Sequence, residues 1–253
     1  MNILVPIAGP DEAFREKGYG PTKNLTELDR KPLVQHVYEN LATLRDARFL
    51  FVVRRDEVAR FHLDGILRLL DPTCQVVVAE GLTAGAACTA LLAIEHIHND
   101  APLIIANGDQ VLLTDLQAAL ADFQARDLDG GIITFDSVHP RWSYVRIDDR
   151  GFVVEASEKR TISRHATAGF YYFRRGRDFV DAATDMIRKD AHVGGGFYVC
   201  PVYNQLVLRQ ARIGIHPIPV EAYYSLANPQ GVQPYETYLK SRPRPAGDAK
   251  SST

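Results

Sequence analysis

The chain has few cysteines, no surplus of either charge and no long hydrophobic run. Its three cysteines stand far apart without CxxC spacing, which argues against a disulfide framework or a zinc site. The 29 basic and 31 acidic residues leave a formal charge of -2, so the basic footprint of a nucleic-acid-binding protein is missing. No segment approaches the roughly 18 apolar residues of a membrane span, and the opening MNILVPIAG lacks the basic start of a signal peptide. We therefore predict a cytoplasmic protein that binds neither nucleic acid nor membrane.

What the chain does contain is an alternation of short apolar runs and helix-length stretches. Buried strands are predicted over residues 2–7, 48–53, 75–79, 103–106 and 131–135. Amphipathic helices are predicted over residues 32–44, 56–70, 85–98 and 114–126. This order predicts an α/β fold, in which crossover units build a mainly parallel sheet with helices on both faces.

The pattern changes near residue 143. Alternating runs at 143–148 and 152–159 surround a Gly-containing turn and predict a β-hairpin. Further elements are predicted as a strand at 165–173, helices at 176–189 and 202–210, and a strand at 213–220. The Pro- and Ser-rich tail, 240–253, is predicted to be disordered. We find no internal repeat or linker, and therefore expect one domain over residues 1–239 with a β-rich insertion.

Two candidate sites follow predicted strands of the parallel sheet. The turn at Ala8 and Gly9 follows the first strand, where small residues let backbone N–H groups approach a phosphate or a base. A glycine needed only for turn geometry is the alternative. Asp109, in the segment Asn107-Gly108-Asp109-Gln110, follows the apolar run LIIA, where a carboxylate can hold Mg²⁺ together with substrate phosphates. The alternative for Asp109 is a cap of the following helix, or a residue that only closes a turn.

A third candidate site lies at the end of the predicted hairpin. Glu158 and Lys159 end one strand, and Thr167, Gly169 and Tyr171 lie on the next. A carboxylate can bind sugar hydroxyls and an ammonium can bind phosphate. Such a pair can equally form a solvated bridge on the surface.

Taken in order, these segments resemble the sugar-phosphate nucleotidylyltransferases, or nucleotide-sugar pyrophosphorylases, especially those of bacterial capsule and lipopolysaccharide pathways. The resemblance is carried by VPIAG, KGY, TKNLTELDRKPLVQHVYENL, GLTAGAACTALLA, NGDQ, EKRTISRHATAGFYYF, FYVCPVYNQL and YYSLANPQGV. It implies a GT-A-like, Rossmann-like fold and Mg²⁺-dependent transfer of NMP from an NTP to a phosphorylated acceptor, above all a sugar 1-phosphate, with release of pyrophosphate. It also implies a nucleotide-binding half, 1–135, and an acceptor-binding half, 136–239.

The resemblance implies a role for each matched residue. Lys23 would neutralise phosphate charge and Asp109 would bind Mg²⁺, which makes these two the catalytic pair. The nucleotide would be bound by Ala8, Gly9, Thr83, Gly85 and Gly108. The acceptor would be bound by Glu158, Lys159, Thr167, Gly169 and Tyr171.

The chain also departs from the family pattern. In the expected G-x-G-x-R loop, Asp11 stands at the second Gly and Ala13 at the Arg. Loss of that arginine would cost about 3 to 4 kcal/mol of transition-state stabilisation unless another residue, such as Arg15 or Lys17, replaces it.

Further departures lie near Lys23 and near the metal turn. Thr22 and Asn24 replace both prolines around Lys23, and Ser225 stands where a second metal carboxylate is expected.

Two other functions stay open. A GT-A-like glycosyltransferase would use a nucleotide-sugar donor, which is already a diphosphate and needs no arginine for a triphosphate. A non-catalytic sensor of nucleotides or sugar phosphates would keep the pocket without turnover. The base and the acceptor are not fixed by the sequence, since a phosphorylated amide or alcohol would suit the same scaffold. The oligomeric state is open too, because members of the family are often dimers or tetramers.

Overall fold

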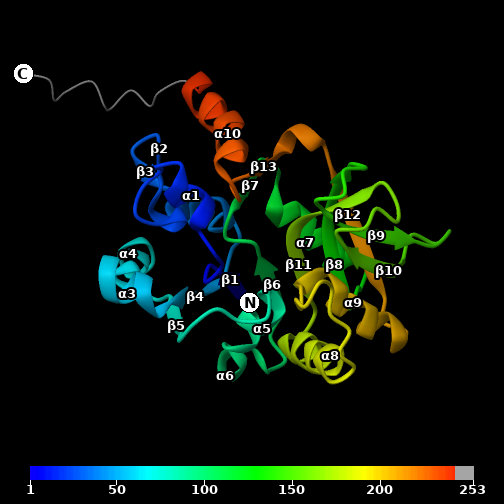
Figure 1. Ribbon diagram of the computed structural model, residues 1–253. Coiled ribbons are helices and arrows are strands. Elements are labelled where there is room, and N and C mark those ends of the chain that lie inside the picture. Colours follow the sequence, from blue (N-terminus) through cyan, green and yellow to red (C-terminus); the bar gives the residue numbers. More distant parts are fainter. Residues whose placement is uncertain (243–253) are drawn as a thin grey trace, which may run out of the picture.

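A nine-stranded sheet runs through the middle of the protein, which the computed structural model describes over residues 1–242 (Figure 1). Its strands are β1 (Asn2–Pro6), β4 (Arg48–Arg54), β5 (Gln75–Ala79), β6 (Leu103–Ala106), β8 (Gly130–Asp136), β9 (Ser143–Ile147), β10 (Val153–Glu158), β11 (His165–Phe173) and β12 (Ile213–Ile218). The order along the sheet is β12-β8-β11-β6-β1-β4-β5, and β9 and β10 extend it beside the start of β11. The pairs β6–β1, β1–β4, β4–β5 and β8–β12 are parallel, whereas β11 runs antiparallel to its three neighbours β6, β8 and β9.

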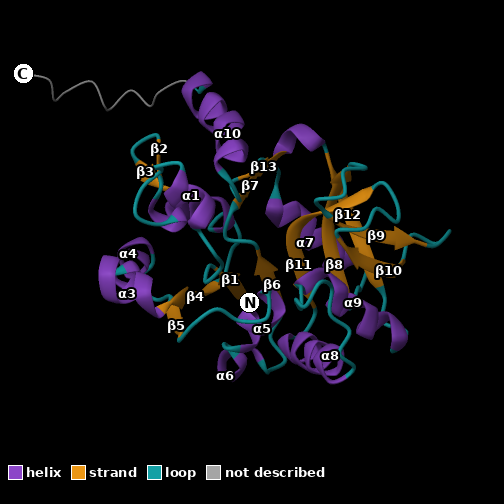
Figure 2. Ribbon diagram, in the orientation of Figure 1, coloured by secondary structure: helices purple, strands orange, loops and turns teal. Residues whose placement is uncertain are grey.

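Helices cover both faces of this sheet (Figure 2). The apolar residues of β1 show why: Ile3 and Val5 belong to one buried cluster and Leu4 to the other, as alternation along a strand requires. The first cluster is completed by α2 (Leu33–Leu41), α4 (Leu63–Leu70), α7 (Leu116–Ala125) and α10 (Pro229–Ser241). The second is completed by α5 (Ala86–Leu91), α6 (Ile94–Ile97), α8 (Gly176–Arg188) and α9 (Val199–Leu208).

The predicted fold class is confirmed. The sheet is mixed but mainly parallel, helices flank it, and the antiparallel pair β9–β10 is the predicted hairpin. Two predicted helices are wrong in extent. The stretch 56–70 is divided into α3 (Arg55–Phe61) and α4 because His62 adopts a left-handed conformation with φ 52°. The stretch 85–98 is divided into α5 and α6 because the amides of Leu92 and Ala93 bond three residues back instead of four.

Shorter elements complete the chain. They are α1 (Glu12–Glu16), a 3₁₀ turn at Lys23–Leu25, the pair β2 (Glu27–Leu28) and β3 (Lys31–Pro32), the pair β7 (Gln110–Leu112) and β13 (Tyr223–Ser225), and a 3₁₀ turn at Val220–Ala222. Helix α10 continues through Ser241, so the predicted tail is helical at its first two residues. The rest of that prediction, from 243 to 253, lies outside the described residues. Over residues 1–242, no helix combines the length and the apolar character needed to cross a bilayer.

Strand β11 is irregular at Gly169, and this irregularity brings it against the segment after β6. Its register with β8 shifts between Thr167 and Tyr171. Gly169 lies between them with φ +62°, and its carbonyl accepts a hydrogen bond from the amide of Asn107 at 2.9 Å. A Cβ at this position would lie 2.3 Å from side-chain atoms of both Asn107 and Gln110, so only glycine fits without displacing them. Strand β11 therefore lies directly against the turn that carries Asp109.

Candidate active site

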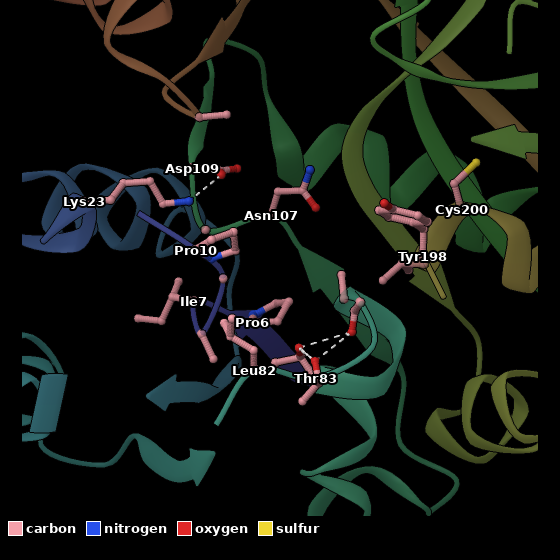
Figure 3. Close-up of a pocket in the computed structure, with 18 of the residues that line it drawn as sticks. Pro6, Ile7, Pro10, Lys23, Leu82, Thr83, Asn107, Asp109, Tyr198 and Cys200 are labelled. Carbon is pink, nitrogen blue, oxygen red and sulfur yellow. Dashed lines mark hydrogen bonds and ion pairs between the residues drawn. The ribbon is translucent and has the colours of Figure 1, made fainter. Parts of the chain in front are cut away.

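A cavity of about 490 Å³ opens beyond the carboxyl ends of β1 and β6 (Figure 3). This edge of an open α/β sheet is where ligands bind as a rule. Of the residues singled out from the sequence, the cavity is lined by Ala8, Gly9, Lys23, Thr83, Gly85, Gly108, Asp109, Glu158 and Tyr171. Segments from both halves of the chain thus form one chamber.

The remaining three predicted site residues do not line the cavity, but each contacts a residue that does. Thr167 shares a hydrogen bond of 2.9 Å with the hydroxyl of Tyr171. The ammonium of Lys159 lies 3.4 Å from the hydroxyl of Tyr198, which lines the cavity. Gly169 contacts the segment of Asp109, as described above.

Lys23 and Asp109 form an ion pair in the wall of the cavity. The Lys23 ammonium donates a hydrogen bond to Asp109 Oδ2 at 2.8 Å, and both side chains are largely shielded from solvent, with exposures of 12% and 25% (Figure 3). Asp109 does not cap the following helix, because Asp115 caps α7 by accepting a hydrogen bond from the amide of Ala118. A carboxylate and an ammonium are therefore held at the cavity surface, where both can contact phosphates or their counterion.

The turn after β1 is held from behind by charged residues that the sequence analysis did not single out. Arg54, at the end of β4, donates hydrogen bonds to the carbonyl of Gly9 at 2.9 Å and to the buried carboxylate of Asp11 at 3.2 Å. Burial lowers the pKa of the Arg54 guanidinium, but its carboxylate neighbours Asp11, Asp56 and Glu57 together outweigh burial and raise the pKa above its ordinary value. Gly9 has no positive φ, and a Cβ there would meet no atom within 4 Å, so turn geometry does not require a glycine at this position.

A buried carboxylate holds the Lys23 turn. Glu57, in the first turn of α3, accepts hydrogen bonds from the hydroxyl of Thr22 and from the side-chain amide of Asn24. Burial raises the pKa of the Glu57 carboxyl, and these hydrogen bonds together with Arg54 oppose that rise.

The loop at Thr83 and Gly85, which the resemblance assigns to the nucleotide and which we call the base-side loop, is fixed by its own hydroxyls and by the segment before α9. The Thr83 hydroxyl lies 3.1 Å from the carbonyl of Gly85 and 2.6 Å from the hydroxyl of Thr89. Gly85 has φ +111°, and a Cβ on it would lie 2.4 Å from the carbonyl oxygen of Phe197. Backbone hydrogen bonds on both sides of Gly85 join the loop to that same residue, from Phe197 to Ala84 and from Ala87 to Phe197. The loop and the segment before α9 are therefore one packed unit.

The far wall carries the predicted acceptor residues. Glu158 is only 8% exposed and accepts a hydrogen bond from the hydroxyl of Ser143, so it is not part of a solvated surface bridge. Burial raises the pKa of its carboxyl, and the Ser143 hydrogen bond and Lys159 counteract this. Burial also raises the pKa of Tyr171 well above its ordinary value, which keeps its hydroxyl neutral and able to donate a hydrogen bond. This wall can therefore recognise hydroxyl groups.

Arg15 and Lys17, the two candidates to replace the arginine expected at position 13, do not line the cavity. Ala13 lies exposed in α1, and Arg15 is bound instead to the carboxylates of Asp11 at 3.4 Å and Glu12 at 3.6 Å. Lys17 lies just after α1, away from the lining. Among the residues that line the cavity, Lys23 is the single cationic side chain.

The residues at Asp109 fit a magnesium ion that arrives with nucleotide phosphates. Within residues 1–242, no group of three or more His, Cys, Asp or Glu side chains could by itself hold a metal. The predicted position of a second carboxylate carries Ser225, whose strand β13 pairs with β7 beside Asp109. Mg²⁺ usually takes one or two protein carboxylates together with waters and substrate phosphates, and one carboxylate is what the site offers.

Comparison with known proteins identifies the family of this chain. Residues 19–192, well over half of the sequence, match the family model described as nucleotidyl transferase. The chain belongs to the nucleotidyl transferase family. No protein with curated function matches it.

The fold of this family member is also that of solved nucleotide-sugar enzymes. It is similar to a nucleoside-diphosphate-sugar pyrophosphorylase from Vibrio cholerae RC9, with TM-score 0.79 and 22% identity over 93% of this chain and 99% of that one. It is also similar to a UDP-glucose pyrophosphorylase complexed with UDP-glucose, with TM-score 0.75 and 15% identity over 95% and 99% of the two chains. At such identities the likeness concerns the fold.

The sequence contained a signal for the residues that were missed. Arg54 and Glu57 follow the buried strand β4 at its carboxyl end, which is the same rule that singled out Asp109 after β6. Their charges within Arg54-Arg55-Asp56-Glu57 instead suggest an ordinary solvent-exposed helix start. Tyr198, directly before α9, and Ser143, at the start of β9, carry no comparable signal.

Proposed function

We propose that this protein is a nucleotidylyltransferase. It would transfer NMP from an NTP to a phosphorylated small molecule, foremost a sugar 1-phosphate, and release pyrophosphate, giving a nucleotide-activated precursor for surface polysaccharide. Family membership supports the transferase class. The substrate and the pathway are part of the proposal.

One observation carries this proposal. The Lys23–Asp109 pair and the Ala8-Gly9 turn line the same cavity as Glu158 and Tyr171, so groups suited to phosphates lie opposite groups suited to hydroxyls. A reaction between a nucleoside triphosphate and a phosphorylated polyol needs both kinds of wall in one chamber.

The proposed reaction is an in-line displacement at phosphorus. An oxygen of the acceptor phosphate forms a bond to the α-phosphorus of the NTP, while the bond from that phosphorus to the bridging oxygen breaks and its electron pair leaves with pyrophosphate. Lys23 neutralises charge on the triphosphate, and the backbone around Ala8 and Gly9 orients it. Asp109 would hold Mg²⁺, which supplies further charge neutralisation at the phosphates when bound.

The acceptor is oriented from the opposite wall in this proposal. Glu158 and Tyr171 bind its hydroxyls, and Lys159 balances its phosphate charge. Phosphoryl transfer depends on positioning and charge neutralisation more than on covalent chemistry, so no protein nucleophile is required.

Pyrophosphate release is the direct test. Purified protein with Mg²⁺ is incubated with each NTP and with dTTP, against sugar 1-phosphates and small phosphorylated alcohols and amides. Release that requires one particular nucleotide and one particular acceptor is the expected result. No release with any pair, together with stabilisation against heat by nucleotides alone, would show a nucleotide sensor instead.

A glycosyltransferase with a nucleotide-sugar donor is the second candidate. It is favoured by the cavity lining, in which Lys23 is the single cationic side chain and the position of the loop arginine is taken by Ala13 outside the cavity. Transfer or hydrolysis of the sugar from UDP-, GDP- or CDP-sugars, without formation of pyrophosphate, would establish this function in place of the first.

A further inference from the structure

Lys23 stands between two buried polar residues that replace prolines of the resembled family. Thr22 is 1% exposed and Asn24 is 2% exposed. Thr22 has φ -154°, which the proline ring, fixed near -65°, cannot adopt. A proline at position 22 could therefore not form this turn. The conformation of the turn has to be fixed by other contacts.

The structure shows what holds it. The Glu57 carboxylate accepts a hydrogen bond from the Thr22 hydroxyl, and the Asn24 side-chain amide lies 2.9 and 3.1 Å from its two oxygens. Glu57 itself is 1% exposed and is fixed on helix α3. Both neighbours of Lys23 in the sequence are thus bonded to one buried carboxylate.

The same contacts tie this turn to the nucleotide-binding turn. The Asn24 amide also donates to the carbonyl of Ile7 at 3.1 Å, directly before Ala8 and Gly9. Arg54, whose guanidinium lies 3.9 Å from the Glu57 carboxylate, bonds the carbonyl of Gly9. A single charged cluster behind the cavity wall therefore fixes both segments that would touch the triphosphate.

We propose that Glu57 is a positioning residue, which fixes the ammonium of Lys23 at the phosphate position by bonding Thr22 and Asn24. Glu57 does not line the cavity, and its hydrogen bonds and ion pair are to Thr22, Asn24 and Arg54 and not to Lys23, so it acts through the two flanking residues. This inference rests on the proposed function for what Lys23 binds, but the ordering of the turn can be measured without any ligand.

Hydrogen exchange tests the ordering. Glu57→Gln keeps the side-chain volume and the oxygen that accepts from Thr22 and from Asn24 at 2.9 Å. It removes the negative charge and turns the oxygen 3.1 Å from the Asn24 amide into an NH₂ group, which cannot accept from that amide and repels it. The amides of Leu25 and Thr26, which bond to the carbonyls of Thr22 and Lys23, are expected to exchange faster in this variant. Asp64→Asn is the matched control, because Asp64 is a helical carboxylate whose bond is to Arg68 on the surface. Unchanged exchange over residues 20–28 in Glu57→Gln would overturn the proposal.

A double-mutant cycle tests whether the effect passes through Lys23. The affinity for inorganic pyrophosphate is measured by calorimetry for the unchanged protein, Glu57→Gln, Lys23→Ala and the double variant. We expect Glu57→Gln to weaken binding about tenfold alone and less than about twofold when Lys23 is already alanine. Equal losses in both backgrounds would mean that Glu57 merely supports the fold, and would refute a positioning role.

The two measurements also separate this inference from the proposed function. If the unchanged protein binds neither pyrophosphate nor any NTP and releases no pyrophosphate, the proposed function fails and Lys23 is not a phosphate-binding residue. Hydrogen exchange still decides whether Glu57 orders the turn. Melting temperatures of all variants identify any that fail to fold, in which case Thr22→Val, which removes one donor to Glu57, takes the place of Glu57→Gln.

Discussion

The ammonium of Lys23 lies 2.8 Å from a carboxylate oxygen of Asp109, although 86 positions separate the two residues in the sequence. The contact joins the 3₁₀ turn at Lys23–Leu25 to the segment between β6 and β7. Each side chain limits where the other can go. Both are accordingly set in place before a ligand arrives, which lowers the cost of orienting them during a reaction.

Replacement of Asp109 with Asn is expected to abolish most of the activity. The variant keeps the shape of the side chain but loses the charge that Lys23 and a magnesium ion would share, and loss of such an electrostatic contact slows turnover by about 10² to 10³-fold. Pyrophosphate release over a range of Mg²⁺ concentrations measures the effect. Turnover close to that of the unchanged protein would show that Asp109 has no catalytic role.

Replacement of Gly85 with Ala is expected to destabilise the fold and to disturb the base-side wall. The added Cβ would lie 2.4 Å from the carbonyl oxygen of Phe197, and the backbone there has φ +111°. Strain of this kind costs about 1 to 3 kcal/mol. Gly81→Ala is the control, since a Cβ at Gly81 meets no atom within 4 Å. Urea unfolding compares the two, and equal stabilities would contradict the packing described for this loop.

The stability contributed by Glu158 is expected to fall as the pH rises. Burial raises the pKa of its carboxyl in the folded protein, so the folded state binds a proton that the unfolded state has already released. The contribution is fully present below the unfolded pKa of about 4.3 and is lost as the pH rises through the folded pKa.

The difference between the unchanged protein and Glu158→Gln isolates this effect, because Glu57, whose pKa is also raised by burial, is common to both. Urea unfolding free energies are measured for both proteins from below the ordinary pKa of glutamate up to neutral pH. We expect the unchanged protein to lose stability relative to the variant over this range. A constant difference would show that Glu158 titrates as an exposed carboxyl.

Replacement of Tyr198 with Phe is expected to affect the acceptor and not the nucleotide. The hydroxyl of Tyr198 accepts a hydrogen bond from Lys159 at 3.4 Å, and the ammonium also lies 5.2 Å from the centre of its ring. Removal of the hydroxyl frees Lys159 and should raise the KM for the acceptor about two- to tenfold, the cost of one ordinary hydrogen bond. Steady-state kinetics with each substrate varied in turn provide the measurement. A change in the KM for the nucleotide alone would show that Tyr198 acts on nucleotide binding and not on acceptor binding.

The sequence was informative where structure is local. The strands at Gln75–Ala79 and Leu103–Ala106 lie at their predicted positions, because each is a short apolar run with clear ends. The break at His62 was not predictable from the apolar pattern, since it depends on a single left-handed residue and the pattern continues across it.

Contacts between distant segments were predicted only through the order of the strands. The position of Asp109 after a central strand placed it at the cavity edge, but nothing local indicates that its partner is Lys23. The role of Glu57 depends on the folding of α3 against the Lys23 turn, and its neighbours in the sequence, Asp56 and Val58, do not reveal it.

The position of β11 between β6 and β8 has a consequence for any attempt to divide the protein. This strand comes from the later part of the chain, yet it covers the edge of β6, and β8 has its partners only in β11 and β12 among the described residues. A fragment that ended at residue 135 would keep the pairing of β6 with β1 but leave the other edge of β6 unpaired, and it would leave β8 without any neighbour. Such open edges recruit strands from other molecules. We therefore expect the first 135 residues, expressed alone, to aggregate, and to become soluble only when the remainder of the chain is supplied with them.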